Sequence, residues 1–247
     1  MNAAYLADLP IRAEYLSALE DTLEDLSRAG AWLDSEARVA IAEVTRSALA
    51  DPEPLAPWEA PSRVPGKLEK LTRRSLLPLA ADAAYRIARY PSTLTAHWYT
   101  QATSQDVRFT DAHYVELVTV VVRVAAADKF CHASGIEPFA FPEPGDGEPT
   151  GHRPALARID RHWVPTLSPK DASEEYPWLY PGKGAPNVLR ALSLVPEAYA
   201  ELRDFQSSGY VAREFLLNPG TNEDRPLSRA QIELVATSTS AQNECFY

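Results

Sequence analysis

A helical segment that occurs more than once constrains the fold of this chain more than any other feature. The final segment, 227–247, reads LSRAQIELVATSTSAQNECFY, and an earlier segment, 109–131, reads FTDAHYVELVTVVVRVAAADKFC. The tripeptide Glu-Leu-Val occupies positions 116–118 in the earlier segment and 233–235 in the later one, at an offset of 117 residues. Self-similarity at a fixed offset indicates one structural unit that is used repeatedly. We therefore expect a repeated helical module.

Both the start and the interior of this module favour helix over strand. Ser228 and Gln231 have the spacing of a capping box, in which side chains satisfy the free N–H groups at the start of a helix. A fainter third copy begins at Leu33, where LDSEARVAIA follows LSRAQIELVA but has Val39 in place of the glutamate. The run VTVVVRV at 118–124 favours a strand by local propensity, but the alanines after it and its alignment with the later copy favour a helix. The predicted fold class is all-α.

Prolines separate the other expected helices. Five of them fall within 51–65, and because proline cannot continue a helix we expect this segment to cross the surface as a loop. Over 11–50 the apolar residues recur at helical spacing, and Gly30 and Asp34 mark a break between two helices. Further helices are expected from about residue 67, over 76–90 and 94–103, and again from residue 187.

Residues 137–186 contain ten prolines and five glycines, a composition that forbids long regular elements. Four aromatic residues argue against simple disorder, because side chains of this size usually pack onto another part of a protein. They are Trp163, Tyr176, Trp178 and Tyr180. We expect this segment to be a linker or an extended arm that wraps around a helical module or a neighbouring subunit.

These patterns divide the chain into three parts. Residues 1–136 are expected to form one or more N-terminal helical modules with a degenerate site, and residues 137–186 the Pro/Gly-rich linker or arm. Residues 187–247 are expected to form a C-terminal helical module. This module carries a glutamate and a cysteine, Glu233 and Cys245, with eleven residues between them, and its motif is expected to be truncated by the end of the chain.

Glu233, Cys245 and the residues around them resemble the alkylhydroperoxidase D-like, or carboxymuconolactone decarboxylase-like, superfamily. In the peroxidase branch of that superfamily a glutamate is followed by eleven residues, by Cys-x-x-Cys, and after three more residues by a histidine. By this resemblance Glu233 matches the glutamate and Cys245 the first cysteine, while the second cysteine would come directly after Tyr247. The resemblance implies an all-helical fold, commonly oligomeric, in which the module can be duplicated.

The resemblance also implies a thiol-dependent antioxidant peroxidase. Cys245 would attack an alkyl hydroperoxide, Glu233 would act as a proton relay, and a dithiol would donate the electrons. No metal or other cofactor is expected. The protein is expected to form a homo-oligomer. Two alternatives stay open: a non-catalytic helical binding or assembly protein of the same fold, and a lactone decarboxylase-like enzyme, which does without the cysteine pair. A cysteine next after Tyr247 and a histidine four residues later would favour the peroxidase, and a true end there would favour the binding protein.

The spacing within the motif restricts how its two residues can cooperate. A reactive thiol needs its pKa lowered from about 8.5 and a base or relay nearby. Twelve residues of straight helix span about 18 Å, too far for the Glu233 carboxylate to serve the Cys245 thiol. Contact therefore requires a turn near Asn243. Such a turn would also place Cys245 at the start of a new helix, where the helix dipole favours a thiolate.

Residues of the earlier copy are weaker candidates. Cys131, His132 and Asp128 are of the right types for a thiol site, but no second cysteine completes the pattern and the family histidine has no counterpart. Cys131 follows a long apolar helix and should be buried, which raises the pKa of a thiol and hides it from reagents. Glu116 and Arg123 lie seven residues apart on one helix face, which favours a structural polar pair.

Charge and composition exclude several other functions. Lys and Arg number 24 against 34 Asp and Glu, and the net charge of -10 repels phosphate backbones and anionic membrane surfaces. Nucleic acids and membranes are therefore not expected as partners. Two cysteines in 247 residues make no disulfide framework and favour a reducing compartment, so we expect a cytoplasmic protein without a signal peptide or a membrane span. The histidines lack metal-ligand spacing, and no phosphate-binding loop or dinucleotide fingerprint is present.

Overall fold

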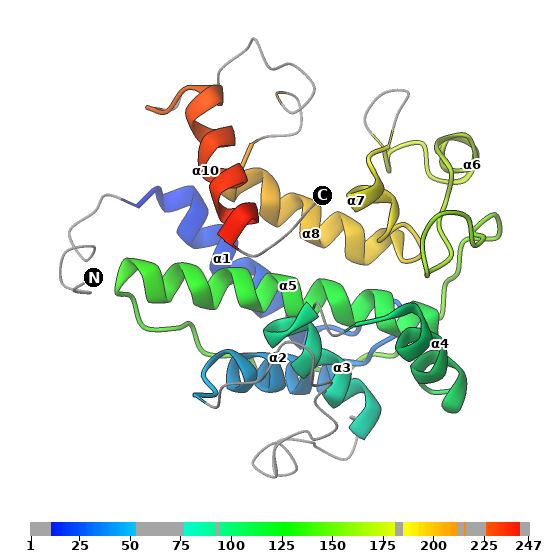
Figure 1. Ribbon diagram of the computed structural model, residues 1–247. Helices are drawn as coiled ribbons and strands as arrows, with labels where there is room; N and C mark the ends of the chain where they lie inside the picture. Colours follow the sequence, from blue (N-terminus) through cyan, green and yellow to red (C-terminus); the bar gives the residue numbers. More distant parts are fainter. Residues whose placement is uncertain are drawn as a thin grey trace. The chain divides into compact units, whose positions relative to one another are not determined.

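The computed structural model describes residues 11–52, 77–91, 94–180, 185–211, 215 and 226–242 (Figure 1). Within these residues the chain forms helices and irregular segments, and the strand-type pairing is limited to one isolated bridge between Arg158 and Thr166. The all-α expectation is therefore confirmed for this part of the chain. The chain divides into two units, Met1–Leu202 and Arg203–Tyr247, which we call unit 1 and unit 2.

Most helices belong to unit 1. In chain order they are α1 (Ala13–Glu24), the 3-10 helix η2 (Asp25–Ser27), α2 (Ser35–Leu49), α3 (Pro78–Arg89), α4 (Ala96–Gln105), α5 (Asp111–Ser134), α6 (Pro169–Glu175) and α7 (Asn187–Arg190). Helix α8 (Pro196–Gly209) begins in unit 1 and ends in unit 2, which also contains α10 (Arg229–Gln242). None of the described helices is both long and apolar enough to cross a membrane.

The expected helical regions correspond to these elements. The predicted break near Gly30 and Asp34 separates η2 from α2, and the helices predicted over 76–90 and 94–103 are α3 and α4. The helix predicted from residue 187 begins with α7 at Asn187. Except for its first two residues, the loop predicted at 51–65 lies outside the described residues, as does the start of a helix near residue 67.

Helix α5 is the central helix of unit 1. It contacts α1, α2 and α3, and Figure 1 shows it running past these three helices. Twelve of its 24 residues are buried, and they include neighbours in sequence such as Val120 and Val121. A helix that is apolar on all sides belongs in a protein core. Burial therefore outweighs the strand propensity of the valine-rich run at 118–124, which is helical as expected.

Local signals set the boundaries of the core helices. The Asp34 carboxylate accepts a hydrogen bond from the Ala37 N–H at 2.7 Å and so caps α2. The Thr95 hydroxyl accepts one from the Trp98 N–H at 3.1 Å at the start of α4. Side chains of these types stabilise helix starts because they satisfy N–H groups that have no partner within the helix. Helix α5 ends at Gly135, whose φ of 68° is a conformation that glycine adopts without a steric penalty.

Part of the Pro/Gly-rich segment lies beside the chain that connects η2 to α2. The Gly145 N–H donates to the Ser27 carbonyl at 2.9 Å, and the Gly151 N–H donates to the Ala31 carbonyl at 2.7 Å. A Cβ atom at residue 145 would lie 2.8 Å from the Ser27 carbonyl oxygen, which explains the glycine at this close approach. These bonds hold residues 145–151 against the chain that connects η2 to α2.

The aromatic residues of this segment pack, as expected, but to different extents. Tyr176 and Tyr180 are buried in a small core with Tyr199 of α8. Trp163 and Trp178 keep exposed fractions of 45% and 40%, although each contacts a tyrosine ring. The irregular backbone of this segment is therefore held partly by a second, tyrosine-rich core.

Four charged side chains form a buried ion cluster in unit 1: Asp25, Arg38, Arg123 and Glu201. Each arginine donates to both carboxylates. Arg123 Nη2 lies 3.0 Å from Asp25 Oδ2, and Arg38 Nη2 lies 2.7 Å from Glu201 Oε2. The two arginine side chains are only 1% and 2% exposed. The cluster therefore joins η2, α2, α5 and α8 through their charges.

Removing one arginine of the ion cluster should destabilise the protein strongly. In Arg123→Met two largely buried carboxylates keep a single cation, and breaking a buried charged group in this way typically costs about 3–5 kcal/mol. The free energy of unfolding from urea denaturation measures the effect. Arg108→Met is the control, because the Arg108 side chain is exposed and its pair with Asp106 is screened by water, so its loss should change stability little. Equal losses in the two variants would contradict a stabilising role for the cluster.

Candidate functional site

Helix α10 carries Glu233, the first of the two predicted site residues. The helix starts with the expected capping box: the Ser228 N–H donates to Gln231 Oε1 at 2.8 Å, and the Gln231 N–H donates to Ser228 Oγ at 3.4 Å. Both carboxylate oxygens of Glu233 have a donor. Arg229 Nε donates to Oε1 at 2.5 Å, and the Tyr210 hydroxyl donates to Oε2 at 2.8 Å. Glu233 is therefore held in place from two directions.

These two donors stabilise the ionised form of Glu233. The hydrogen bond from Tyr210, followed by that from Arg229, lowers the pKa of Glu233 below its usual value. Burial, and then the bond to Glu233, raises the pKa of Tyr210. At neutral pH the pair consists of a carboxylate and a protonated phenol. The carboxylate can accept a proton from a reacting group, and the phenol can donate one.

The sequence analysis missed both partners of Glu233. Arg229 precedes Glu233 by four residues, a spacing that brings two side chains together on a helix, so this contact could have been found. Tyr210 lies 23 residues away, and no local pattern connects the two positions. Arg229 Nη1 also donates to the Phe215 carbonyl at 3.0 Å, which ties α10 to the chain before it.

Cys245, the second predicted site residue, lies outside the described residues, and so does the turn predicted near Asn243. Helix α10 runs without a break to Gln242. The last described residue is therefore nine positions beyond Glu233, or about 14 Å along the helix axis. Contact between the thiol and this carboxylate still requires the chain to turn back after Gln242.

Glu116 is aligned with Glu233 in sequence, but its carboxyl group is buried, whereas that of Glu233 is partly exposed. The Glu116 side chain is buried on α5, and Oε2 accepts a hydrogen bond from the Trp32 N–H at 2.7 Å. Oε1 is buried and has no hydrogen-bond partner among the described residues. Burial raises the pKa of Glu116 to about 7, although the Arg38 charge and the Trp32 N–H act against this shift. Glu116 therefore keeps its proton to a higher pH than Glu233, which is ionised at neutral pH.

The connection between η2 and α2 closes directly over Glu116. A Cβ atom at residue 30 would collide with the Glu116 carboxyl group, so this position requires glycine. The Gly30 N–H donates to the Leu33 carbonyl at 2.8 Å, which holds the tight turn. Glu116 and Arg123, expected to form a polar pair, bond to different partners, because Arg123 belongs to the ion cluster. Glu116 therefore anchors the turn and is not open to a substrate.

The remaining candidates on α5 do not form a thiol site. Cys131 is fully buried, as expected, and burial raises the pKa of its thiol. Asp128 accepts two hydrogen bonds from Arg46, at 2.8 Å and 2.7 Å, while the Arg46 guanidinium lies 3.7 Å from the centre of the Phe141 ring. His132 is exposed. In the part of the chain that the structure describes, no group of His, Cys, Asp and Glu is arranged to hold a metal ion.

The raised pKa of Glu116 predicts a specific pH dependence of stability. The folded state holds this proton more tightly than the unfolded chain, so the contribution is complete below about pH 4.5 and is lost as pH rises through about 7. A shift of this size corresponds to about 3 kcal/mol. Glu116→Gln should flatten the curve of unfolding free energy against pH between about pH 5 and pH 8. Urea denaturation at a series of pH values measures this free energy of unfolding.

Glu233→Gln is the matched control for this experiment. Its carboxylate has a lowered pKa and is ionised in both folded and unfolded states over the same pH range. The curve of unfolding free energy against pH for Glu233→Gln should therefore have the same slope as that of the unsubstituted protein. If Glu116→Gln also keeps that slope, Glu116 does not take up a proton on folding.

Burial of Cys131 predicts that the two cysteines differ in reactivity. In the native protein a maleimide should modify Cys131 much more slowly than Cys245, because the Cys131 thiol is buried and its pKa is raised. Mass spectrometry of peptides from a labelling time course measures both rates. In denaturant the two rates should become similar. Faster labelling of Cys131 in the native protein would reverse the assignment of the reactive cysteine.

Comparisons with known proteins neither support nor oppose the resemblance described above. No family model matches the sequence, and no curated protein and no solved structure matches the chain. The residues of the chain itself therefore indicate its function: the motif that contains Glu233 and Cys245, and the donors that surround Glu233.

Proposed function

We propose that the chain is a thiol-dependent peroxidase in which Cys245 reacts with the hydroperoxide and Glu233 relays protons. The observation that carries the proposal is the Glu233 carboxylate, which is ionised and held by Tyr210 at 2.8 Å and by Arg229 at 2.5 Å. This carboxylate stands at the position that the peroxidase motif reserves for glutamate relative to Cys245. An ionised carboxylate can accept the proton of the Cys245 thiol, and the Tyr210 hydroxyl holds that carboxylate in place.

Helix starts at matching sequence positions support a repeated helical module, which is part of this proposal. With the offset of 117 residues, Asp111 at the start of α5 corresponds to Ser228, one residue before α10 begins. In the third copy, which begins at Leu33, Ser35 at the start of α2 corresponds to Arg229 at the start of α10. Three aligned segments thus begin a helix within one residue of each other. We propose that the last copy is reactive and that the α5 copy has become structural.

The proposed reaction balances without a metal. The Cys245 thiol gives its proton to Glu233, and the thiolate sulfur attacks the terminal oxygen of the hydroperoxide. The O–O bond breaks, the sulfur becomes a sulfenic acid, and the departing alkoxide takes a proton from the pair formed by Glu233 and Tyr210. One thiol of the dithiol donor then attacks the sulfenic sulfur and releases water. The second thiol completes the donor disulfide and restores Cys245.

A helical assembly protein is the second candidate, and the exposed apolar residues of α10 favour it. None of the residues of α10 is buried, and Leu234 and Val235 are 67% and 61% exposed. Leu117, which corresponds to Leu234 in the earlier copy, is 0% exposed. Apolar side chains that remain exposed together can mark an interaction site. A second copy of the chain would be the expected partner, which is also compatible with a peroxidase.

Peroxide consumption separates these two functions. With cumene hydroperoxide and an excess of dithiol, Cys245→Ser should reduce the rate to background because the reacting sulfur is lost. Glu233→Gln should reduce it about 10²- to 10⁴-fold, the usual contribution of a proton relay. An extended chain with cysteine directly after Tyr247 and histidine four residues later should react faster than the present chain, because the second thiol can resolve the sulfenic acid as a disulfide.

Two matched controls and a second measurement complete this test. Cys131→Ser and Glu36→Gln should retain the rate, because Cys131 is buried and Glu36 is an exposed residue of α2. Dimedone should trap a sulfenic acid at Cys245, which peptide mass spectrometry can locate. Background rates in all variants, together with no trapped sulfenic acid, would favour the assembly protein.

A further inference from the structure

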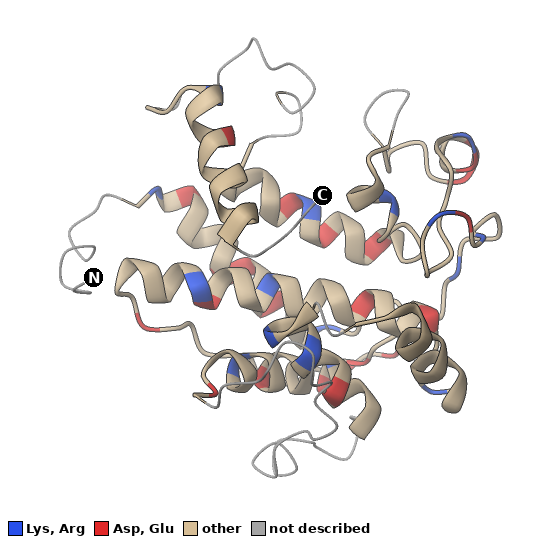
Figure 2. Cartoon of the chain, in the orientation of Figure 1, with Lys and Arg blue, Asp and Glu red and all other residues tan. Residues whose placement is uncertain are grey.

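A loop of unit 1, residues 158–166, is held in place before helix α6. Basic and acidic residues lie close together in this irregular part of the chain (Figure 2). The Arg158 N–H donates to the Thr166 carbonyl at 3.2 Å, and the Thr166 N–H donates to the Arg158 carbonyl at 2.9 Å. Arg190 of α7 donates to Asp160 Oδ2 at 2.9 Å. These bonds close the loop and tie it to α7, so the loop forms a fixed wall.

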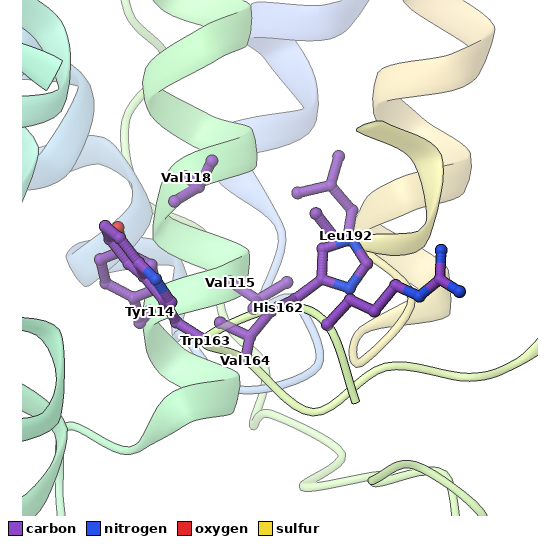
Figure 3. Close-up of a pocket in the computed structure, with 9 residues that line it drawn as sticks. Tyr114, Val115, Val118, His162, Trp163, Val164 and Leu192 are labelled. Carbon is purple, nitrogen blue, oxygen red and sulfur yellow. The ribbon is translucent and has the colours of Figure 1, made fainter. Parts of the chain in front are cut away.

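This loop, helix α5 and the residues directly after α7 line a pocket of about 390 Å³ (Figure 3). Val115 and Val118 of α5, Val164 of the loop and Leu192 after α7 contribute aliphatic side chains. No cysteine lines the pocket, so the proposed peroxidase chemistry does not use it. Small-molecule pockets usually have volumes of about 300–1,000 Å³. The pocket is therefore large enough for one substituted ring.

The apolar part of the pocket belongs to the core of unit 1. Val115, Val164 and Tyr114 are buried, and the centres of the Tyr114 and Tyr99 rings lie 5.1 Å apart. Figure 3 shows the Tyr114 and Trp163 rings together at one end of the pocket. Transfer of apolar surface from water to such a wall is favourable, and a wall that is already packed loses little conformational entropy on binding. The pocket therefore favours a flat apolar body.

Arg161 is the residue of the lining that can select a charge. The His162 ring offers a ligand little, because its Nδ1 is buried and its Nε2 lies 3.2 Å from the Asn187 carbonyl oxygen. Arg161 is exposed, and within the part of the chain that the structure describes its side chain makes no hydrogen bond or ion pair. The neighbouring Asp160 carboxylate is paired with Arg190. The Arg161 guanidinium is therefore available at the edge of the pocket.

We propose that this pocket binds a small apolar carboxylate, such as an aromatic acid, with its ring against Val115 and Val118 and its carboxylate paired with Arg161. A guanidinium matches a carboxylate through two parallel hydrogen bonds. The chain as a whole has a net charge of -10 and repels anions, so selection of an anion must come from this local charge. The site does not involve Glu233 or Cys245, so binding and peroxidase activity can be tested separately.

Three probes of one shape and different charge test the ligand class: 4-methylbenzoate is anionic, 4-methylbenzamide neutral and 4-methylbenzamidine cationic. NMR chemical-shift titration of the full chain measures the dissociation constants. 4-Methylbenzoate should bind about two- to fivefold more tightly than 4-methylbenzamide, the usual contribution of an exposed ion pair, and 4-methylbenzamidine should bind most weakly. High salt should reduce the advantage of 4-methylbenzoate. No binding at millimolar concentration, or 4-methylbenzoate binding no more tightly than 4-methylbenzamide, would overturn the proposal.

A charge variant tests the role of Arg161. Arg161→Gln should remove the advantage of 4-methylbenzoate and leave the affinity for 4-methylbenzamide unchanged, because only the ion pair is lost. Arg108→Gln removes the same charge from an exposed arginine that does not line the pocket, and it should leave both affinities unchanged. A preference for 4-methylbenzoate that survives in Arg161→Gln, or that both variants lose equally, would overturn the pairing with Arg161 and with it the proposal.

Bulky variants locate the probes within the chain. Val118→Trp should fill the pocket and abolish binding of 4-methylbenzoate and 4-methylbenzamide, whereas Val107→Trp, at a position that is 89% exposed, should leave both unchanged. Ala191→Leu narrows the pocket by less, should weaken both probes, and serves if Val118→Trp does not fold. Unchanged binding in a folded Val118→Trp or Ala191→Leu protein would place the probes elsewhere and overturn the proposal.

Discussion

The burial of Arg38 and Arg123 is the interaction on which the architecture of unit 1 depends. A guanidinium in a protein core costs several kcal/mol unless carboxylates and other acceptors surround it. Asp25 and Glu201 supply these carboxylates from η2 and α8. The requirement couples four elements that are distant in sequence, because none of them can move without leaving a buried charge unpaired. The valine-rich helix α5 can therefore lie in the core of unit 1 although it carries the charged residue Arg123.

The glutamates of the two Glu-Leu-Val tripeptides are in two different chemical states. Glu116 is sealed by the turn at Gly30, and its pKa is raised to about 7 by burial. Glu233 has two donors, and its pKa is lowered. The residue type is identical, so the difference comes from burial, hydrogen bonding and neighbouring charges. One copy suits structural anchoring, and the other suits the proton transfer that we propose.

Much of the fold could be predicted from local patterns. The capping box at Ser228, the break before α2 and the helical character of the run at 118–124 depend on short-range chemistry and on apolar periodicity, both visible in sequence. Burial of Cys131 followed from the apolar helix before it. The partners of the buried arginines could not be predicted, because Arg123 and Glu201 are 78 residues apart and charge alone does not select among many acidic residues.

The sequence by itself determined the helical class, the helix start at Ser228, the break before α2, and the spacing between Glu233 and Cys245 that motivates a thiol reaction. Tertiary structure alone decided that Tyr210 donates to Glu233, that a glycine turn seals Glu116, and that two arginines pair with carboxylates in the core of unit 1. The physical reason is the distance along the chain over which each kind of interaction acts. Caps and periodicity act within a few residues, whereas desolvation, charge pairing and cavity shape depend on side chains that only the folded chain brings together.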